Sequence, residues 1–338
     1  MNETMKRQPK GCLFLFYPQA SRGASGMPRP TVKWAAQAGP QKMFHVKHFS
    51  FSAFPHIFSD SPLKDIISLV IMVSYVNLTF YNKKVGTFVA KTIAIVNQKG
   101  GVGKSTTCVN LAAALAETGK RVLLCDFDPQ ANATSGMGVD KTLSKGIYEV
   151  LVSDTPAQDA LVHTKYGDVL PSNKALAGAG IELIGFERRE FLLKDALGQV
   201  KSDYDYIFID CPPSLELLTL NALCAADSLL VPVQGEYYAL EGLSDLMNTV
   251  RIVRRSLNPK LELEGVLLTM FDGRTNLALQ VAEEVKHYFP GKVYATVIPR
   301  NVRLSEAPSH GKPITAYDRA CRGAEAYTAL ADEFLKKQ

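Results

Sequence analysis

Apolar and polar positions alternate along the chain in a pattern that predicts short buried strands separated by helices. Compact apolar runs rich in Val, Ile and Leu are typical of strands that are buried on both faces. Such runs occur at residues 91–97, 121–125, 169–170, 206–209, 228–233, 263–270 and 293–298. Stretches with helical spacing separate most of them, at 105–118, 181–200, 215–226, 240–257 and 277–289. This order predicts an α/β fold, a mostly parallel twisted sheet with helices on both faces.

Composition divides the chain at the point where this pattern begins. Residues 1–90 hold eleven Lys and Arg against three acids, a net charge of +8, whereas residues 91–338 carry −3. The overall charge of +5 is therefore a property of the N-terminal part. A segment as long as 91–338 is close to the upper size for one hydrophobic core, so we expect a single domain there. Residues 1–90 are expected to form a poorly ordered extension.

A glycine-rich turn joins the apolar run 91–97 to the helical stretch 105–118. Its residues, KGGVGKST, follow the phosphate-binding pattern G-x-x-x-x-G-K-[ST], except that Gln98 stands where the first glycine should be. Gly100, Gly101 and Gly103 allow backbone dihedrals that are closed to other residues, so successive N–H groups can converge on phosphate oxygens. The N-terminus of the following helix adds its positive end at the same point. The sequence therefore predicts a site for a nucleoside triphosphate.

Each residue type in this loop has a chemical reason to be there. We expect Lys104 to neutralise the β and γ phosphates and the Ser105 hydroxyl to ligate Mg²⁺. The residues expected to bind the nucleotide are Lys99, Gly100, Gly101, Val102, Gly103, Lys104, Ser105 and Thr106. Lys99 is one cation more than phosphate binding requires. Considered alone, it is most simply interpreted as a solvated loop lysine.

Three aspartates follow apolar runs. Asp126 and Asp128 come after 121–125, and Asp210 comes directly after 206–209. Ligands of open parallel sheets collect at the carboxyl ends of the strands, where these side chains should lie. A lone aspartate after a strand is usually a solvated turn residue. Three of them in a chain with a phosphate-binding loop favour an active site.

The loop and the segment that follows it are similar to a known family. KGGVGKST and RVLLCDFDPQANAT (121–134) resemble the ParA/MinD group of P-loop ATPases, whose Walker A motif is deviant. Residues 204–214, 231–243, 265–276 and 297–313 are similar to the chromosomal ParA/Soj branch, in register from about residue 91 onward. The resemblance implies a P-loop fold and a chromosome-partitioning ATPase that uses ATP and Mg²⁺. It also implies a cytoplasmic, nucleoid-associated protein.

The resemblance assigns roles to single residues. It implies that Lys99 reaches the phosphates bound by the other subunit of a nucleotide-sandwich homodimer, and that hydrolysis happens only there. It makes Asp128 the residue that orients the attacking water, so that Lys99, Lys104 and Asp128 form the catalytic set. Asp126 would lie near the metal, and Asp210 would be the Walker B carboxylate that holds Mg²⁺ with Ser105. Pro299 and Asn301 would contact adenine.

A net charge of −3 gives residues 91–338 no overall basic character, so DNA binding is expected from local features only. Arg274 and Arg303 match basic positions through which Soj-like proteins contact DNA. The alternative for both is a solvated face or an ion pair. The expected partners are non-specific double-stranded DNA, a ParB-type centromere-binding protein that stimulates hydrolysis, and a replication initiator. No membrane is expected.

Two other functions stay open at this point. A MinD-like ATPase would bind membrane through a C-terminal amphipathic helix, but residues 329–338 offer few apolar anchors and two acids. A nonenzymatic DNA-binding regulator would use ATP only as a ligand. The chain has no C-x-x-C pair, which argues against a zinc site or the iron–sulfur carrier of the same fold.

The extension has its own alternatives. Residues 66–76 are apolar, but a membrane span needs about 20 residues. A basic, acid-poor leader is also typical of an organellar transit peptide. We favour a translation start placed too early. Residues 43–48, Met-Phe-His-Val-Lys-His, can be encoded by a string that contains TGTTTCACGTGAAACA, a palindrome matching the ParB site. The true start would then be Met72, Val85 or Val89.

Overall fold

The computed structural model describes residues 18–22, 28–32, 89–236 and 239–338, which fall into two units. The first unit, residues 1–79, contains the antiparallel strands β1 (Pro18–Arg22) and β2 (Pro28–Val32), which pair from Pro18↔Val32 to Arg22↔Pro28. The apolar stretch 66–76 and the proposed start sites Met72 and Val85 lie outside the described residues, whereas Val89 is the first residue of the range 89–236. The expected boundary at residue 90 stays a prediction.

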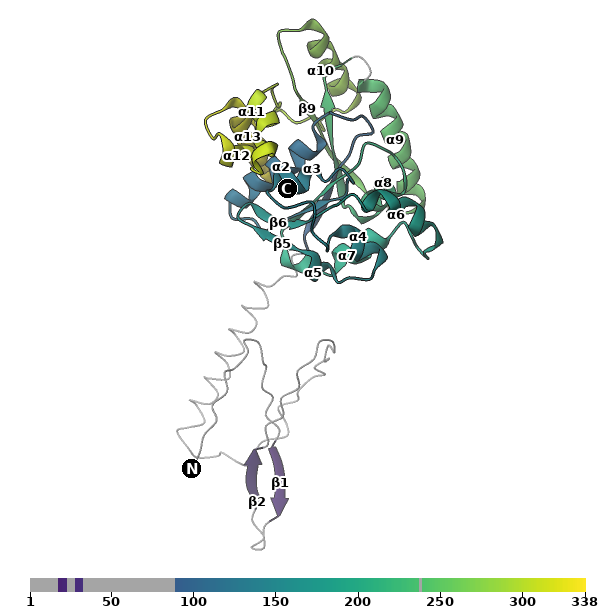
Figure 1. Cartoon of the computed structure of the whole chain (residues 1–338), viewed down its shortest axis with the longest axis vertical. Helices are drawn as coiled ribbons and strands as arrows, with labels where there is room; N and C mark the ends of the chain where they lie inside the picture. Colours follow the sequence, from purple (N-terminus) through teal and green to yellow (C-terminus); the bar gives the residue numbers. More distant parts are fainter. Residues whose placement is uncertain (1–17, 23–27, 33–88, 237–238) are drawn as a thin grey trace, which may run out of the picture. The chain divides into compact units, whose positions relative to one another are not determined.

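A seven-stranded sheet forms the centre of the second unit (Figure 1), and its strand order is β5-β6-β4-β7-β3-β8-β9. The strands are β3 (Lys91–Ile95), β4 (Val122–Asp126), β5 (Val162–Thr164), β6 (Gly167–Leu170), β7 (Tyr206–Asp210), β8 (Ser228–Gln234) and β9 (Glu262–Thr269). All neighbours pair in parallel except β5 and β6, which form an antiparallel edge. The predicted α/β fold with a mostly parallel sheet is confirmed.

Strand register decides which chemistry meets at the carboxyl edge. β7 lies between β3 and β4, with Asp210 opposite Ile95 on one side and opposite Asp126 on the other. The three central strands therefore end together. The glycine-rich loop that follows β3 begins beside the carboxylates that end β4 and β7.

Helices cover both faces of the sheet, and side chains of one strand alternate between the two cores. In β3, Ile93 and Ile95 face one hydrophobic cluster, whereas Ala94 faces the other. The first cluster includes α2 (Lys104–Glu117), α12 (Ile314–Tyr317) and α13 (Arg322–Lys336), and the second includes α4 (Ile147–Val152), α6 (Leu176–Glu182), α7 (Leu192–Gly198), α8 (Leu217–Ala225), α9 (Ala239–Ser256) and α10 (Asn276–Tyr288).

Two predicted elements are wrong. Residues 181–200 do not form one helix, because α6 ends at Glu182 and a 3-10 turn, Leu183–Gly185, follows it. The chain then breaks before α7, with Arg188 at φ +52. Glycines at 185 and 198 and the left-handed residue between them interrupt the periodic pattern.

Residues 293–298 do not form a strand either. This segment runs beside β9 but pairs with it only at isolated points, such as Val293 with Val266. The amide of Ile298 donates to the carbonyl of Leu268 at 2.9 Å. Tyr294 and Ile298 are each buried individually, and this burial explains why the segment is apolar.

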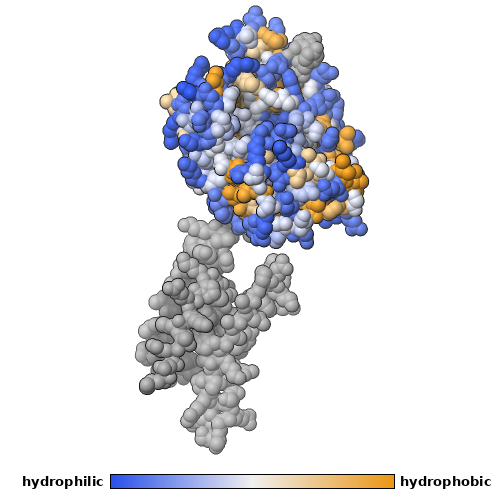
Figure 2. Space-filling view, in the orientation of Figure 1, coloured by the Kyte–Doolittle hydropathy of each residue, from blue (hydrophilic) through white to orange (hydrophobic). Residues whose placement is uncertain are grey.

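The sequence pattern did not predict several short helices and a short strand. These are β5, α3 (Asn132–Gly136), α4, α5 (Ala157–Ala160), α11 (Val302–Glu306) and α12. Figure 2 shows a largely hydrophilic surface on the side in view, with apolar side chains gathered near α6. Ile181 and Ile184 are 77% and 60% exposed there. In the described part of the chain, no helix is long and apolar enough to cross a membrane.

Candidate active site

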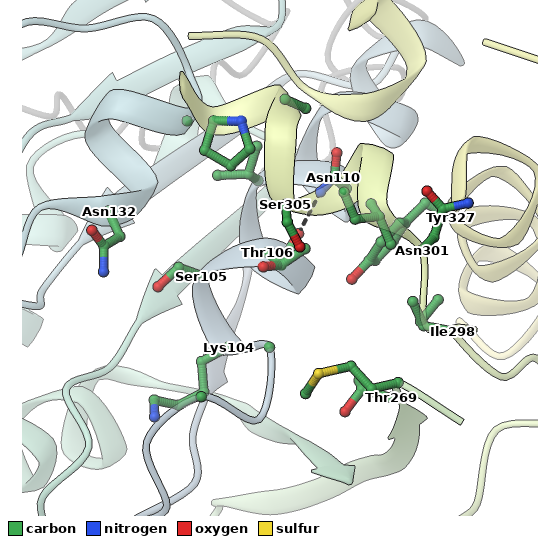
Figure 3. Close-up of a pocket in the computed structure, with 18 of the residues that line it drawn as sticks. Lys104, Ser105, Thr106, Asn110, Asn132, Thr269, Ile298, Asn301, Ser305 and Tyr327 are labelled. Atoms are coloured by element: carbon green, nitrogen blue, oxygen red, sulfur yellow. Dashed lines mark hydrogen bonds between the residues drawn. The ribbon is translucent and has the colours of Figure 1, made fainter. Parts of the chain in front are cut away.

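A pocket of about 530 Å³ opens at the carboxyl edge of the sheet, within the size range of small-ligand sites. The glycine-rich loop and the start of α2 form its floor, and the segment from Ile298 to Pro308 forms a wall. Figure 3 shows Thr269 and Ile298 on one side of this pocket and Asn132 on the other, with Lys104, Ser105 and Thr106 between them. Polar groups from distant parts of the chain therefore converge on one space.

The loop has the backbone conformation that its glycines predict. Gly101 and Gly103 adopt φ values of +75° and +89°, which side chains with a Cβ rarely allow. Gly103 precedes the first residue of α2 and is its N-cap. No atom comes within 4 Å of a Cβ built at Gly100 or Gly101. The helix N-terminus and an open, unobstructed loop thus face the pocket.

Two contacts from distant strands hold the loop from below. The Asn97 side chain donates to the carbonyl of Pro232 in β8 at 2.8 Å and accepts from the amide of Lys99 at 3.0 Å. The Thr269 hydroxyl donates to the carbonyl of Val102 at 2.7 Å. Both side chains are buried. Sequence reasoning missed these residues, because the bonded partners lie far apart in the chain and no local pattern marks them.

Lys104 points toward the loop and its carboxylates. It is only 6% exposed, and its ammonium donates to the carbonyl of Lys99 at 3.1 Å. Burial lowers the pKa of Lys104, and the negative charge of Asp210 opposes that shift. A desolvated cation with few protein partners is well suited to phosphate oxygens.

Lys99 makes a different contact. Its ammonium forms an ion pair with the carboxylate of Glu236, which follows β8, and Lys99 is not among the residues that line the pocket. Both side chains are partly exposed, at 36% and 46%. The two lysines of the loop therefore differ in direction within one chain.

Asp126 and Asp128 lie side by side but have different surroundings. Asp126 is fully buried and accepts from the amide of Asp128 at 3.2 Å. Its other oxygen accepts from the amide and the hydroxyl of Thr134, at 2.6 and 2.7 Å. Burial raises the pKa of Asp126 to about 6, although the Thr134 bonds oppose the shift. Asp126 thus holds the backbone of Asp128, which lines the pocket.

Asp210 is fully buried, and neither of its oxygens has a hydrogen-bond partner among the described residues. Burial, followed by the charge of Asp126, raises its pKa well above the ordinary value, while the nearby Ser105 hydroxyl and Lys104 ammonium oppose this. An unpartnered carboxylate beside a hydroxyl is a donor set that Mg²⁺ prefers. Within the described residues no group of three or more His, Cys, Asp and Glu could hold a metal by itself. Mg²⁺ commonly completes its shell with phosphates and water.

The far wall of the pocket contains Pro299 and Asn301, and their contact with adenine stays a prediction. Asn301 caps α11, where its side chain accepts from the amide of Arg303 at 2.9 Å. Pro299 pairs with Phe271, just beyond β9. Other lining residues were not predicted from the sequence, among them Asn132, Thr269, Arg300, Ser305, Lys312 and Tyr327.

Arg274 and Arg303 lie outside the pocket lining, and both make ion pairs. Arg274 is 89% exposed in its side chain and binds Asp272 through two nitrogens, at 2.6 and 2.8 Å. This bidentate contact lowers the pKa of Asp272 to about 2. Arg303 pairs with Glu306 at 2.8 Å and with Asp318 at 3.4 Å. The ion-pair alternative therefore describes both side chains in this structure.

Comparisons with known proteins identify the family of this fold. Residues 90–263 match the protein family described as "AAA domain". The chain is 63% identical over 246 residues to the sporulation initiation inhibitor protein Soj of Bacillus subtilis, covering 72% of this chain and 97% of that protein. It is 55% identical over 252 residues to the chromosome partitioning protein ParA of Myxococcus xanthus, covering 74% and 89%.

Solved structures of other proteins are similar to the fold of this chain. Cobyrinic acid a,c-diamide synthase from Mycobacterium smegmatis, with a bound ATP analogue and magnesium, is 40% identical with a TM-score of 0.67, covering 73% of this chain and 95% of that one. The cell division ATPase MinD of Pyrococcus furiosus is 28% identical with a TM-score of 0.61, covering 74% and 100%. Because identity is above one half with Soj and ParA over nearly their whole length, this chain belongs to the ParA/Soj family of chromosome-partitioning ATPases.

Proposed function

We propose that this ATPase works as a nucleotide-dependent clamp. Two ATP-bound chains form a sandwich dimer, the dimer binds double-stranded DNA without sequence preference, and a ParB-type protein stimulates hydrolysis and release. The outcome is segregation of chromosome origins by a nucleoid-associated cytoplasmic protein, with a replication initiator as a further partner. The observation that supports this proposal is that the side chains of Lys99 and Lys104 point in different directions and make different contacts.

Lys104 alone serves the pocket of its own chain. Its ammonium is buried against the loop, whereas the ammonium of Lys99 pairs with Glu236 outside the pocket lining. Exchange of Glu236 for the phosphates of a second chain would satisfy Lys99 with a stronger charge-assisted contact. Positive charge supplied from a partner stabilises the charge that develops in phosphoryl transfer.

Bound Mg²⁺ would neutralise part of the phosphate charge. Ser105 and Asp210 are the residues proposed to hold it, with Asp210 acting through water. Asp128 orients the attacking water. Its backbone and its side chain are both held, because its amide donates to Asp126 and its carboxylate accepts from the amide of Gln130 at 2.9 Å.

A membrane-positioning function is less well supported. The apolar side chains of α13 are used inside the fold, where Tyr327, Leu330 and Phe334 are at most 1% exposed. The Phe334 ring packs edge-on against Tyr206 with centroids 5.2 Å apart. A helix whose apolar face is buried in its own domain has nothing left to insert into lipid.

One binding experiment tests the clamp. Binding to a random-sequence duplex is measured with and without ATP for wild type, Lys99→Ala and Asp128→Ala, with Lys260→Ala as a control at the opposite edge of the sheet. We expect Lys99→Ala to bind ATP but not DNA, and Asp128→Ala to stay on DNA because it cannot hydrolyse. DNA binding by Lys99→Ala at the wild-type level with ATP would refute the proposal. Slow ATP turnover that the ParB-type protein fails to stimulate would favour the nonenzymatic regulator.

A further inference from the structure

The end of β9 connects the phosphate-binding loop with the turn that carries Arg274. Thr269, the last residue of β9, is 2% exposed. Its hydroxyl donates to the carbonyl of Val102 across 167 residues of sequence. Its Cβ and Cγ2 lie 3.7 Å from where a Cβ on Gly103 would be. One side chain therefore binds Val102 and lies beside Gly103.

The chain is equally constrained beyond Thr269. Met270 adopts φ +47, a left-handed conformation that non-glycine residues rarely take. The amide of Phe271 then donates to the carbonyl of Ile298 at 2.9 Å, on the pocket wall. Asp272 accepts from the amide and from two guanidinium nitrogens of Arg274. Thr269 is thus fixed to the loop, Phe271 to the pocket wall and Asp272 to Arg274, with the constrained backbone of Met270 between them.

The Thr269 bond and phosphate binding favour the same loop conformation. Phosphate oxygens need the N–H groups of the loop to face the pocket, so carbonyls of the same peptides must face away from it. The Thr269 hydroxyl binds one such carbonyl, that of Val102, from below. A ligand that stabilises the loop strengthens this contact, and by linkage the contact strengthens ligand binding.

We propose that Thr269 is a positioning residue that couples the phosphate-binding loop to the Arg274 turn. Nucleotide in the loop fixes the end of β9 through the Thr269 hydroxyl. The end of β9, through Met270 and Asp272, fixes the position of the Arg274 guanidinium. This proposal rests on the proposed function, because it takes Arg274 as a DNA contact.

The test compares Thr269→Val, which removes the hydroxyl and keeps the shape, with Thr269→Ser, which keeps the hydroxyl. Thr164→Val is the matched control, since the Thr164 hydroxyl also donates to a carbonyl, that of Gly167 at 2.6 Å, at the far edge of the sheet. Two quantities are measured: affinity for a non-hydrolysable ATP analogue with Mg²⁺, and the factor by which that analogue raises affinity for a random-sequence duplex.

We expect Thr269→Val to reduce that factor about fivefold to tenfold, as loss of one buried hydrogen bond would. Thr269→Ser and Thr164→Val should keep the wild-type factor. A wild-type factor in Thr269→Val overturns the proposal. If Thr269→Val does not fold, Thr269→Ala against Thr269→Ser makes the same comparison.

The proposed function can be refuted independently of the role proposed for Thr269. If wild type shows no nucleotide-dependent DNA binding, the clamp is refuted. The role of Thr269 is then decided by analogue affinity alone. Thr269→Val must lower this affinity and Thr269→Ser must restore it, whereas equal affinities in all variants overturn the proposal.

Discussion

Lys99 pairs with Glu236 of its own chain. The pair joins the loop after β3 to the turn after β8, two strands that are neighbours in the sheet. A cation proposed to act on a second chain is thus held by an acid of the first until that chain arrives. In the proposed dimer Lys99 would leave this pair, so we expect Glu236 to oppose dimerisation.

Glu236→Gln should therefore strengthen nucleotide-dependent dimerisation. The pair is partly exposed, and such pairs contribute about 0.2–1 kcal/mol, so we expect a dimer dissociation constant lowered by up to about fivefold. Sedimentation with a non-hydrolysable ATP analogue measures it, with Glu241→Gln as an exposed control. Weaker dimerisation of Glu236→Gln would show that Glu236 supports the interface.

Asp210→Asn should separate stability from catalysis. The Asp210 carboxylate is buried without a hydrogen-bond partner among the described residues, so a neutral amide removes an electrostatic cost. We expect the ligand-free melting temperature to rise by a few degrees while ATP hydrolysis falls at least about 100-fold. Calorimetry with and without Mg²⁺-ATP and a phosphate-release assay measure both. A lower melting temperature would contradict the account of this carboxylate.

Arg274→Ala and Arg303→Ala should weaken DNA binding without affecting dimerisation. Each phosphate contact that is lost should reduce the slope of log affinity against log salt by about 1. Titration of a random-sequence duplex at several salt concentrations gives that slope, and Lys260→Ala serves as the exposed control. Loss of dimerisation in either variant would instead assign it a structural role through Asp272 or Glu306.

Glu333 should contribute to stability in a pH-dependent way. Partial burial alone would raise its pKa, but bonds from Lys337 and from the amides of Ala295 and Thr296 lower it to about 2. A lowered carboxyl pKa stabilises the fold above the unfolded value, and that stability is lost as pH falls from about 4.5 toward 2.

Screening by solvent leaves about 1 kcal/mol of this contribution at neutral pH. Urea unfolding of wild type and Glu333→Gln checks it. The difference between the two proteins should shrink as the solution is acidified through that window. A difference that is constant with pH would exclude the ionised carboxylate as its source.

Local patterns in the sequence were sufficient to predict the loop and its carboxylates. The strand before Lys99, the glycines and the helix after Lys104 all lie within one short stretch, and their chemistry follows from their order. Asp126 and Asp210 were predicted because parallel strands end at one edge. The sheet order itself, which makes these two residues direct neighbours, was not.

Long-range contacts could not be predicted. Glu236, Thr269 and Thr134 each complete the site through a partner whose position depends on the folded sheet, and no periodicity marks them. The wrong prediction of a strand at 293–298 has the same cause. Its apolar residues are buried against β9 without continuous pairing, and a sequence pattern reports burial, not hydrogen bonding.

Complementation between two inactive variants tests the central claim, that Lys99 acts on the ATP of the other chain. Lys99→Ala keeps Asp128, and Asp128→Ala keeps Lys99, so a mixed dimer contains one complete site if Lys99 acts across the interface. The two proteins are mixed in equal amounts before ATP is added, and phosphate release is measured. We predict negligible turnover for each variant alone and clear turnover for the mixture, because only a mixed dimer contains one complete site. Turnover of the mixture no higher than the sum of its parts would contradict the account.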